Sequence, residues 1–380
     1  MARIAISVCG EGRGHASRIV ALVDRLGHDH EVLLYATADG YEFLRRQFEG
    51  QRGRVEVRQN PGIVFQYSAG RLHVLRSIAA GFDFQARELG PLVDRLTREL
   101  EAFGAELAIT DFEPTLPRAA RRRRIPLVSV DHQHFLRAYE LKSLPRALQW
   151  NAWSMSYAVW MYVVQPSDIV VSAFFRPRLR RGWQHVVQVG PLLRTSLLRA
   201  VPEDGGFVLS YLRRHTPLAA IEALAGCGTP VKVYGLGRRT PVGCVTFHEI
   251  DERQFVDDLA GCSAVVAAAG NQLIGESLHL GKPMLVLPER AHAEQRINAH
   301  FLAGMGCGEF TLLEEVTDER IRAFLESRER YADGLACVAG CMDGTPEVLR
   351  VIHDRLQRSS SHGDRHPSRV LLHGDDGNRG

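Results

Sequence analysis

The sequence has few features that would tie the protein to a specialised environment. Its seven cysteines are an odd number with scattered spacings, and no Cys-x-x-Cys pair occurs; the closest two are Cys337 and Cys341. This argues against structural zinc and a disulfide framework, and we expect a reducing cytoplasm. The net charge of the 380 residues is only +3, so composition gives no reason to expect a nucleic-acid partner.

Long hydrophobic runs are missing as well. No apolar run reaches the roughly 20 residues of a bilayer-spanning helix, and the N-terminus has one charge, a very short apolar run and then glycines, unlike a signal peptide. Residues 148–166 come closest, because they lack charged side chains and hold three of the four tryptophans. We expect a buried helix and strand there. An apolar acceptor pocket and a membrane-surface patch are the functional alternatives.

What the sequence does contain is a regular alternation of short apolar strands and helical segments. In the first half, the patterns predict helices over 16–27 and 86–103 and strands over 3–8, 30–37, 55–59, 106–111, 125–134, 168–174 and 185–193. After a linker at 199–207, strands are predicted over 207–212, 230–237, 245–250, 263–270 and 283–288, with helices between them and after them. Such alternation is typical of parallel, doubly wound α/β sheets. We therefore predict an α/β protein with two tandem Rossmann-like domains.

The first candidate site follows the first predicted strand, where the sequence reads GEGRGHASR. Gly10, Gly12 and Gly14 allow a ligand to approach the backbone at the carboxyl end of the strand. The helix that begins near His15 offers free N–H groups and a positive dipole end. As a dinucleotide fingerprint the motif is incomplete, because His15 stands where the third glycine belongs. His15 is therefore either a solvated side chain after a tight turn or a general base.

The second candidate site lies in residues 265–302, VVAAAGNQLIGESLHLGKPMLVLPERAHAEQRINAHFL. Gly270 ends a predicted strand and opens a helix, so the free N–H groups at 270–272 suit a diphosphate. The carboxylate of Glu276 is suited to two ribose hydroxyls. Glu294 and Gln295 are suited to the hydroxyls of a sugar.

This segment resembles the donor-binding signature of GT-B glycosyltransferases, which runs from a glycine pair through a glutamate, a Gly-x-Pro and a proline to an acidic residue with Gln and an Asn-Ala pair. The spacing of Gly270 and Glu276 matches, and so does EQRINA. With GEGRGHASR, ITDFEP and SVDHQH, the chain looks closest to UDP-glycosyltransferases and to the bacterial and archaeal relatives of the lipid II-forming N-acetylglucosaminyltransferase. It departs from the signature at Ala269, in place of the first glycine, and at Ala268, where many members carry a phosphate-binding histidine.

The resemblance implies two domains that face each other across a cleft. Residues 1–195 would bind the acceptor and residues 206–340 the nucleotide sugar. Residues 341–358 would form a helix that packs back on the N-terminal domain. The Ser/Gly/His/Asp-rich tail at 359–380 is expected to be disordered.

The resemblance also assigns roles to single residues. His15 would be the catalytic base and Asp111 would orient it, although an aspartate after a strand is also a common turn residue. The acceptor site would comprise Gly12, Gly14, Asp131, His132 and His134, for the last three of which a polar loop is an equal alternative. The donor site would comprise Ser210, His248, Gly270, Asn271, Gln272, Glu276, Glu294 and Gln295.

The function implied is that of an inverting, metal-independent glycosyltransferase without a cofactor, which moves a hexose-type sugar from a UDP-sugar to an acceptor hydroxyl. The acceptor, a lipid, a saccharide or a small natural product, stays open, and so does peripheral contact with the inner face of the membrane. A sugar-nucleotide 2-epimerase uses the same tandem fold, but would need acidic groups around the sugar carbons. A dinucleotide-dependent oxidoreductase would leave the motif at 265–302 unexplained.

Overall fold

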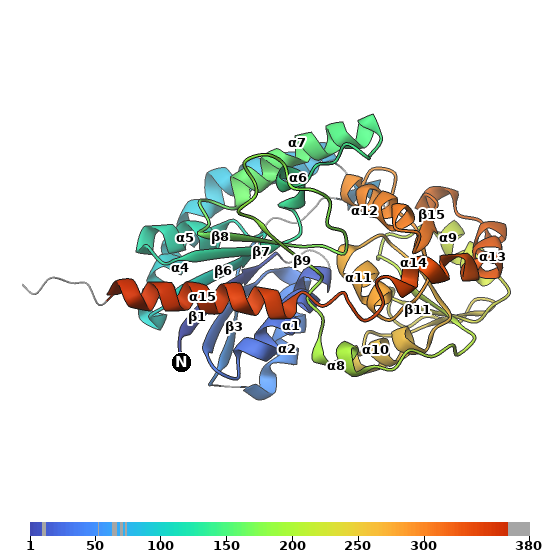
Figure 1. The fold of residues 1–380 in the computed structure, drawn as a ribbon, viewed down its shortest axis with the longest axis horizontal. Helices are drawn as coiled ribbons and strands as arrows, with labels where there is room; N and C mark the ends of the chain where they lie inside the picture. Colours follow the sequence, from blue (N-terminus) through green and yellow to red (C-terminus); the bar gives the residue numbers. More distant parts are fainter. Residues whose placement is uncertain (10–12, 52, 63–66, 69–70, 73, 364–380) are drawn as a thin grey trace, which may run out of the picture.

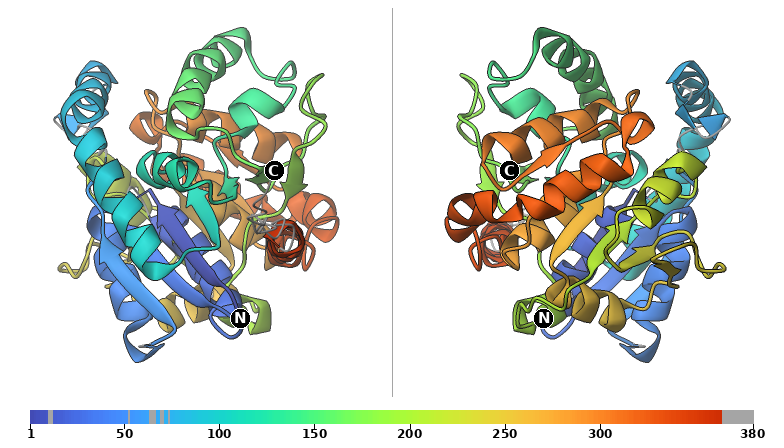
Figure 2. Two further views of the ribbon diagram at one scale, coloured as in Figure 1. Left: turned by 90° about the vertical axis from the view of Figure 1, so that its left-hand side faces the viewer. Right: turned by 90° about the vertical axis from the view of Figure 1, so that its right-hand side faces the viewer.

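The computed structural model describes residues 1–9, 13–51, 53–62, 67–68, 71–72 and 74–363 of the chain. They form a seven-stranded and a six-stranded sheet, with strand orders β3-β2-β1-β6-β7-β8-β9 and β12-β11-β10-β13-β14-β15. Every pair of neighbouring strands in these two sheets is parallel, and helices cover both faces of each sheet (Figures 1 and 2). The predicted α/β fold with two tandem Rossmann-like domains is therefore confirmed.

The N-terminal sheet is built from short apolar strands, most of which are almost entirely buried. They are β1 (Arg3–Val8), β2 (Glu31–Ala36), β3 (Val55–Gln59), β6 (Leu107–Asp111), β7 (Leu127–Asp131), β8 (Asp168–Ser172) and β9 (Val187–Val189). The helices of this half are α1 (Arg13–Leu26), α2 (Ala38–Gln47), α3 (Val74–Asp83), α4 (Leu89–Phe103), α5 (Thr115–Arg123), α6 (Phe135–Ala138) and α7 (Arg146–Tyr162). Short elements between them are η1 (Glu49–Gln51), β4 (Tyr67–Ser68), β5 (Arg71–Leu72) and η2 (Phe84–Glu88).

The C-terminal half repeats the same design. Its strands are β10 (Val208–Tyr211), β11 (Val231–Tyr234), β12 (Val245–Phe247), β13 (Ala264–Ala267), β14 (Met284–Val286) and β15 (Gly308–Phe310). Its helical elements are α8 (Thr195–Arg199), α9 (Leu218–Ala225), α10 (Glu252–Gly261), α11 (Asn271–His279), α12 (Ala293–Gly304), η3 (Leu313–Glu315), α13 (Asp318–Glu326), η4 (Arg328–Tyr331), α14 (Ala332–Ala336) and α15 (Thr345–Gly363).

The order of the strands determines where a ligand can bind. In each sheet the chain reverses its direction of growth at one point, between β1 and β6 in the first and between β10 and β13 in the second. Such switch points leave a crevice at the carboxyl ends of the strands. His15, near the start of α1, and Asp111, the last residue of β6, lie at the first switch point, and Gly270 lies at the second.

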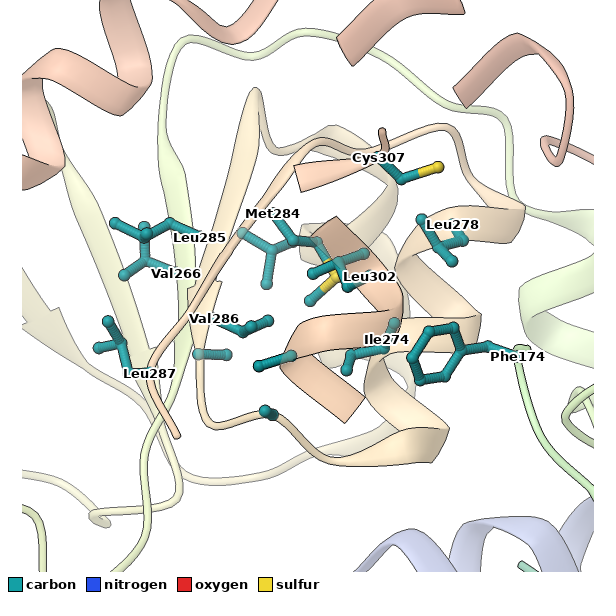
Figure 3. Packing of buried hydrophobic residues seen from close by; sticks show 14 of the residues in the cluster. Phe174, Val266, Ile274, Leu278, Met284, Leu285, Val286, Leu287, Leu302 and Cys307 are labelled. Carbon is teal, nitrogen blue, oxygen red and sulfur yellow. The ribbon is translucent and has the colours of Figure 1, made fainter. Parts of the chain in front are cut away.

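The hydrophobic core runs from one domain into the other. On α11, Ile274 and Leu278 pack towards Met284 and Val286 of β14, and Phe174 of the N-terminal domain lies beside Ile274 (Figure 3). All of these side chains belong to one buried cluster. The two domains therefore share apolar packing around α11, and this packing stabilises their relative position.

The last helix returns to the N-terminal domain. α15 contacts α1 and β9, Val348 and Ile352 are buried in the N-terminal core, and Arg355 Nε donates to Asp168 Oδ2 at 2.6 Å. The helix continues to Gly363, five residues beyond the predicted end at 358. The remainder of the predicted tail, residues 364–380, lies outside the described residues.

Two local expectations were wrong. Residues 148–162 belong to one helix, α7, with no following strand before β8, and large side chains on its outer face are exposed rather than buried. Gly14 is not part of a turn, because α1 already begins at Arg13. No helix within the described part of the chain is both long and apolar enough to cross a membrane.

The chain between β9 and β10, residues 190–207, is longer than the predicted linker at 199–207, and this whole linker segment begins by passing directly across α11. An ideal Cβ on Gly275, a buried residue in the middle of α11, would lie 2.1 Å from Pro191 Cγ of the linker, so only glycine fits there. We expect Gly275→Ala to lower the free energy of unfolding by about 1–3 kcal/mol through this overlap.

Gly304→Ala is the matched control, because a Cβ at the end of α12 meets nothing within 4 Å. Its free energy of unfolding should stay the same or rise by up to about 1 kcal/mol. Urea denaturation of both variants measures the difference. Equal stabilities would show that the linker is not held against α11.

Candidate active site

The centre of the site is a hydrogen-bonded pair from two elements of the N-terminal sheet. His15, in the first turn of α1, has its Nδ1 2.9 Å from Oδ1 of Asp111 at the carboxyl end of β6. The aspartate is fully buried, and the histidine side chain is 15% exposed. Because Asp111 accepts from Nδ1–H, the other ring nitrogen, Nε2, is left to act as a proton acceptor.

A third side chain binds the aspartate of this pair. Arg18, one turn after His15 on α1, donates from Nη1 to the same Oδ1 of Asp111 at 3.0 Å, and it is 2% exposed. Its Nε and Asp111 Oδ2 are both buried, and neither has a hydrogen-bond partner among the residues that the structure describes. A buried carboxylate is costly unless its charge is balanced, and Arg18 supplies that balance.

The loop after β7 forms the neighbouring edge of the site. Asp131 accepts from the His134 backbone N–H at 2.8 Å and, at Oδ2, lies 2.6 Å from His134 Nδ1, while Ser129 Oγ also donates to Oδ2. Burial alone would raise the pKa of Asp131, but the charge of His134 and these hydrogen bonds lower it to about 2. Asp131 and His134 thus bind each other and brace the loop. The side chains of this loop that contact other parts of the site are His132 and Gln133.

His132 connects the two domains. Its Nδ1 lies 3.2 Å from the Ser172 carbonyl and its Nε2 3.3 Å from Oδ1 of Asn298 on α12. Oε1 of Glu294, in the first turn of α12, is 4.0 Å from the same Nε2. Burial lowers the pKa of His132 to about 3, so we expect the ring to be neutral, with a single N–H that donates either to the Ser172 carbonyl or to Asn298 Oδ1.

Glu294 of the C-terminal domain lies near His15 of the N-terminal domain. Burial raises the pKa of this carboxyl group, and the nearby His15 and Arg18 oppose the rise. Gln133 lies between them, with its amide nitrogen 3.5 Å from His15 Nε2. The N-terminal domain therefore contributes a histidine, an arginine and an amide to the cleft, and the C-terminal domain contributes a carboxylate.

The N-terminal half of α11 also contacts the N-terminal domain, next to the first turn of α1. A Cβ built on Gly14 would lie only 3.4 Å from Gln272 Cβ. Gly270 precedes the helix, no side chain caps it, and its first turn carries no acidic residue. The N–H groups and the positive dipole end of α11 are thus brought close to the first turn of α1.

Two polar side chains of α11 bind the N-terminal half of the chain. Asn271 accepts from the Phe174 backbone N–H and donates to the Ser172 carbonyl, both at 3.2 Å. Gln272 donates to the Leu192 carbonyl at 2.8 Å and to Glu276 Oε1 at 3.0 Å. In this structure, both residues predicted to bind the donor act as contacts between the domains.

Glu276 has a partner that the sequence did not suggest. Arg194, in the linker, places Nη2 3.1 Å from both carboxylate oxygens of Glu276 and also binds Glu252 at the start of α10. Arg194 and Glu276 are 4% and 2% exposed. A buried ion pair survives only when its charges are matched and hydrogen-bonded, which is the case here.

The other residues that were predicted to bind the donor lie at separate places in the C-terminal domain. Ser210 is buried with its Oγ unpartnered, and His248 stacks on Tyr234 and bonds to Thr246 at 2.9 Å. Gln295 accepts from the Glu289 backbone N–H at 2.9 Å and so braces the loop before α12. Gly12, predicted at the acceptor site, lies outside the described residues together with Gly10.

A separate cavity of about 490 Å³ opens in the C-terminal domain, beyond β10, β11 and β12. Glycine backbone at 235 and 237, the apolar Ile250 and the charged Arg214 and Glu249 are among its lining. The cavity lies past the carboxyl ends of these strands, and its lining residue Glu249 directly follows His248 in the sequence. The described residues hold no group of three His, Cys, Asp or Glu side chains arranged for a metal ion.

Several side chains of the site were not predicted from the sequence. Arg18 had a signal, because its spacing of three residues from His15 puts both on one helical face. Asn298 lay in the quoted motif without an assigned role. Gln133 lay in the segment SVDHQH without an assigned role. Arg194 and Glu252 had no sequence signal, since Arg194 is distant in the chain from both of its partners, Glu252 and Glu276.

The neutral state of His132 predicts how stability depends on pH. An unfolded histidine takes up a proton below about pH 6.5, whereas folded His132 does so only near pH 3. The unfolded state therefore binds one more proton in this range, and acid destabilises the fold by about 1.4 kcal/mol per pH unit for this group. In His132→Asn, the slope of the free energy of unfolding between pH 6 and 4 should be shallower by that amount. An unchanged slope would mean that folded His132 is protonated.

Comparison with known proteins agrees with this architecture. The sequence matches the family described as glycosyl transferase family 1 over residues 2–328. An uncharacterized glycosyltransferase of Methanosarcina acetivorans is 27% identical to it and aligns over 94% of this chain and 97% of its own length.

Solved glycosyltransferase structures share the fold. Arabidopsis thaliana UGT89C1 complexed with UDP-L-rhamnose has a TM-score of 0.65 at 15% identity and covers 93% of this chain and 99% of its own. Glycyrrhiza uralensis UGT73P12 complexed with glycyrrhetinic acid 3-O-monoglucuronide has a TM-score of 0.64 at 14% identity, with 96% and 97% covered. The chain therefore belongs to glycosyl transferase family 1 and is a glycosyltransferase with the GT-B fold.

Proposed function

We propose that the protein is an inverting glycosyltransferase that moves a hexose-type sugar from a UDP-sugar to an acceptor hydroxyl without a metal ion. The observation that carries this proposal is the His15–Asp111 pair, which lies near the N-terminal half of α11 where the two domains meet. A base on one side and a positive helix end on the other are what a direct displacement at an anomeric carbon needs.

In the proposed reaction, Asp111 keeps Nδ1 of His15 protonated, and Nε2 takes the proton of the acceptor hydroxyl. The acceptor oxygen then bonds to the anomeric carbon from one face while the bond to the diphosphate breaks on the other. The negative charge that develops on the diphosphate is stabilised by the N–H groups and dipole of α11. Because Ala268 and Ala269 precede Gly270, backbone groups rather than a histidine carry this task on the strand side.

Two features of the C-terminal domain support the proposed position of the donor. The 490 Å³ cavity near the ends of β11 and β12 offers backbone groups and Ile250 to a nucleobase. Glu294 faces the catalytic pair and is suited to a sugar hydroxyl. Arabidopsis UGT89C1, a structural neighbour, was solved with UDP-L-rhamnose, which supports a UDP-sugar as the first donor to test.

The predicted ribose contact requires a rearrangement. A carboxylate offers about four lone-pair positions, and Arg194 and Gln272 already occupy three of those on Glu276. We propose that a ribose hydroxyl takes the remaining position, or replaces Gln272, while Arg194 keeps the carboxylate charged. The acceptor would enter from the side of Gln133 and His132; its identity as lipid, saccharide or small natural product is left to screening.

Donor choice can be measured as a shift of the thermal unfolding midpoint with UDP, GDP, dTDP or NAD, with and without magnesium. Saturating UDP at about 100 times its Kd should stabilise the fold by about 2.7 kcal/mol, equally with and without magnesium. A shift with NAD alone would contradict the donor site. A shift only with magnesium would contradict metal independence.

The catalytic role of His15 is tested by His15→Ala. Transfer should fall by about 10²–10⁴-fold, because a general base of this kind contributes that much, while the UDP-induced thermal shift remains. His28→Ala, which removes an exposed histidine beyond the far end of α1 from His15, is the control for nonspecific loss. Unchanged transfer in His15→Ala would refute the base assignment, and sugar conversion without any acceptor would favour the epimerase.

A further inference from the structure

α7 carries a row of exposed aromatic side chains on its outer face. Trp150, Trp153, Tyr157 and Trp160 are 66%, 48%, 56% and 66% exposed. Their spacing of three, four and three residues puts them on one side of the helix. Trp150 stacks on Trp153 with ring centroids 4.8 Å apart, and Tyr157 meets Trp153 edge-on at 5.3 Å.

The opposite face of α7 packs against the protein, and this packing holds the helix in place although the aromatic rings stay exposed. Leu148, Ala152 and Val159 are almost completely buried, and α7 contacts α6 and α12. The helix lies along the outer edge of the molecule, at the top in Figures 1 and 2. The aromatic row is therefore a surface feature rather than an incompletely buried core, and contiguous exposed patches of this kind mark interaction sites.

Positive charge gathers at the N-terminal end of the same helix. Residues 136–186 contain two acidic side chains, Glu140 and Asp168, and seven basic ones: Arg137, Lys142, Arg146, Arg176, Arg178, Arg180 and Arg181. Asp168 is bound to Arg355.

Backbone pairing brings the two basic segments together before α7 begins. Tyr139 forms an antiparallel bridge with Leu179, Glu140 N–H donates to the Arg178 carbonyl, and Arg180 N–H donates to the Ala138 carbonyl. Lys142, Arg146, Arg178 and Arg181 are exposed. An uncharged aromatic helix face thus has a cationic cluster at one end.

We propose that this face of α7 docks on an anionic lipid bilayer, with the four rings at the headgroup level and the basic cluster against the lipid phosphates. Tryptophan and tyrosine prefer this interface because one part of the ring is apolar and the other forms hydrogen bonds. Basic residues beside such a helix add attraction to anionic lipids. The proposal concerns lipid binding alone and does not depend on the reaction at His15.

The charge distribution favours a bilayer over a second copy of the chain. A twofold dimer through this face would bury the same surface of both copies, so two cationic clusters would be drawn onto one interface, which is unfavourable. Docking would also bring the site close to the membrane, because α7 contacts α12, whose first turn carries Glu294.

The tryptophans allow a direct test on the full-length protein. Three of the four lie in the row, and the fourth is Trp183. Adding vesicles of phosphatidylcholine and phosphatidylglycerol in equal parts should shift the emission to shorter wavelength, and brominated lipids should quench it. Pure phosphatidylcholine should produce a much smaller effect. Raising the salt to 1 M, where the Debye length is about 3 Å, should weaken binding.

Substitutions distinguish lipid binding by the aromatic row from nonspecific binding by any exposed apolar side chain. Cosedimentation of Trp150→Ser/Trp153→Ser/Trp160→Ser with the anionic vesicles should fall at least about tenfold, and Lys142→Glu/Arg146→Glu should lose the preference for anionic lipid. The matched control is Val201→Ser/Leu218→Ser, which removes exposed apolar side chains, 73% and 66% exposed, away from α7. It should bind like the unmodified protein. All of these side chains are on the surface, so thermal unfolding should confirm that each variant is folded.

Three results would overturn the proposal. The first is no spectral shift with anionic vesicles in the folded protein. The second is vesicle binding that the triple tryptophan variant retains. The third is a concentration-dependent dimer, lost in that variant, without vesicle binding; this would assign the row to a second copy.

Discussion

The burial of α11 between the two domains is the constraint on which the site depends. Its side chains Asn271 and Gln272 satisfy backbone groups of the N-terminal half, and the Glu276 carboxylate is neutralised by Arg194 of the linker. The linker passes so close to the helix that Gly275 has no room for a side chain. Because these groups lie in the interior, leaving any one of them unpaired is costly, and the two sheet edges are therefore held facing each other.

This arrangement brings basic and acidic side chains of the two domains close together. The first turn of α1 supplies His15 and Arg18, which share Asp111, and α12 supplies Glu294 from the other domain. The close contact between the domains also restricts the proposed binding of the donor. Glu276 meets Arg194 and Gln272 in the present arrangement, so a ribose would have to share the carboxylate rather than find it free. The interdomain contact and the proposed donor contact thus rely on the same short helix.

α7 illustrates why hydrophobicity alone misplaced one element. A segment without charges reads as buried when only its composition is considered, and residues 148–166 were expected inside on that basis. Burial, however, is set by what the neighbouring elements cover, and α6 and α12 cover only the side of α7 that carries Leu148, Ala152 and Val159. The spacing of the tryptophans was visible in the sequence, but the side of the helix that would face solvent was not.

The sequence by itself determined the fold class, the positions of most strands, and the placement of His15, Asp111 and Gly270 after strands, because apolar periodicity and glycine punctuation are local properties of the chain. It also carried the glycosyltransferase signature at 265–302. Only the tertiary structure decided which side chains face the cleft and which are used as braces. Asp131 and His134 bind each other, Gln295 supports a loop, and Arg194 reaches Glu276 over a separation of 82 residues. The first two contacts are local, but a loop residue can either brace its own loop or face a ligand, and the sequence does not distinguish these roles. The Arg194–Glu276 pair depends on how the two sheets are placed against each other, and a separation of 82 residues leaves no periodic signal along the chain.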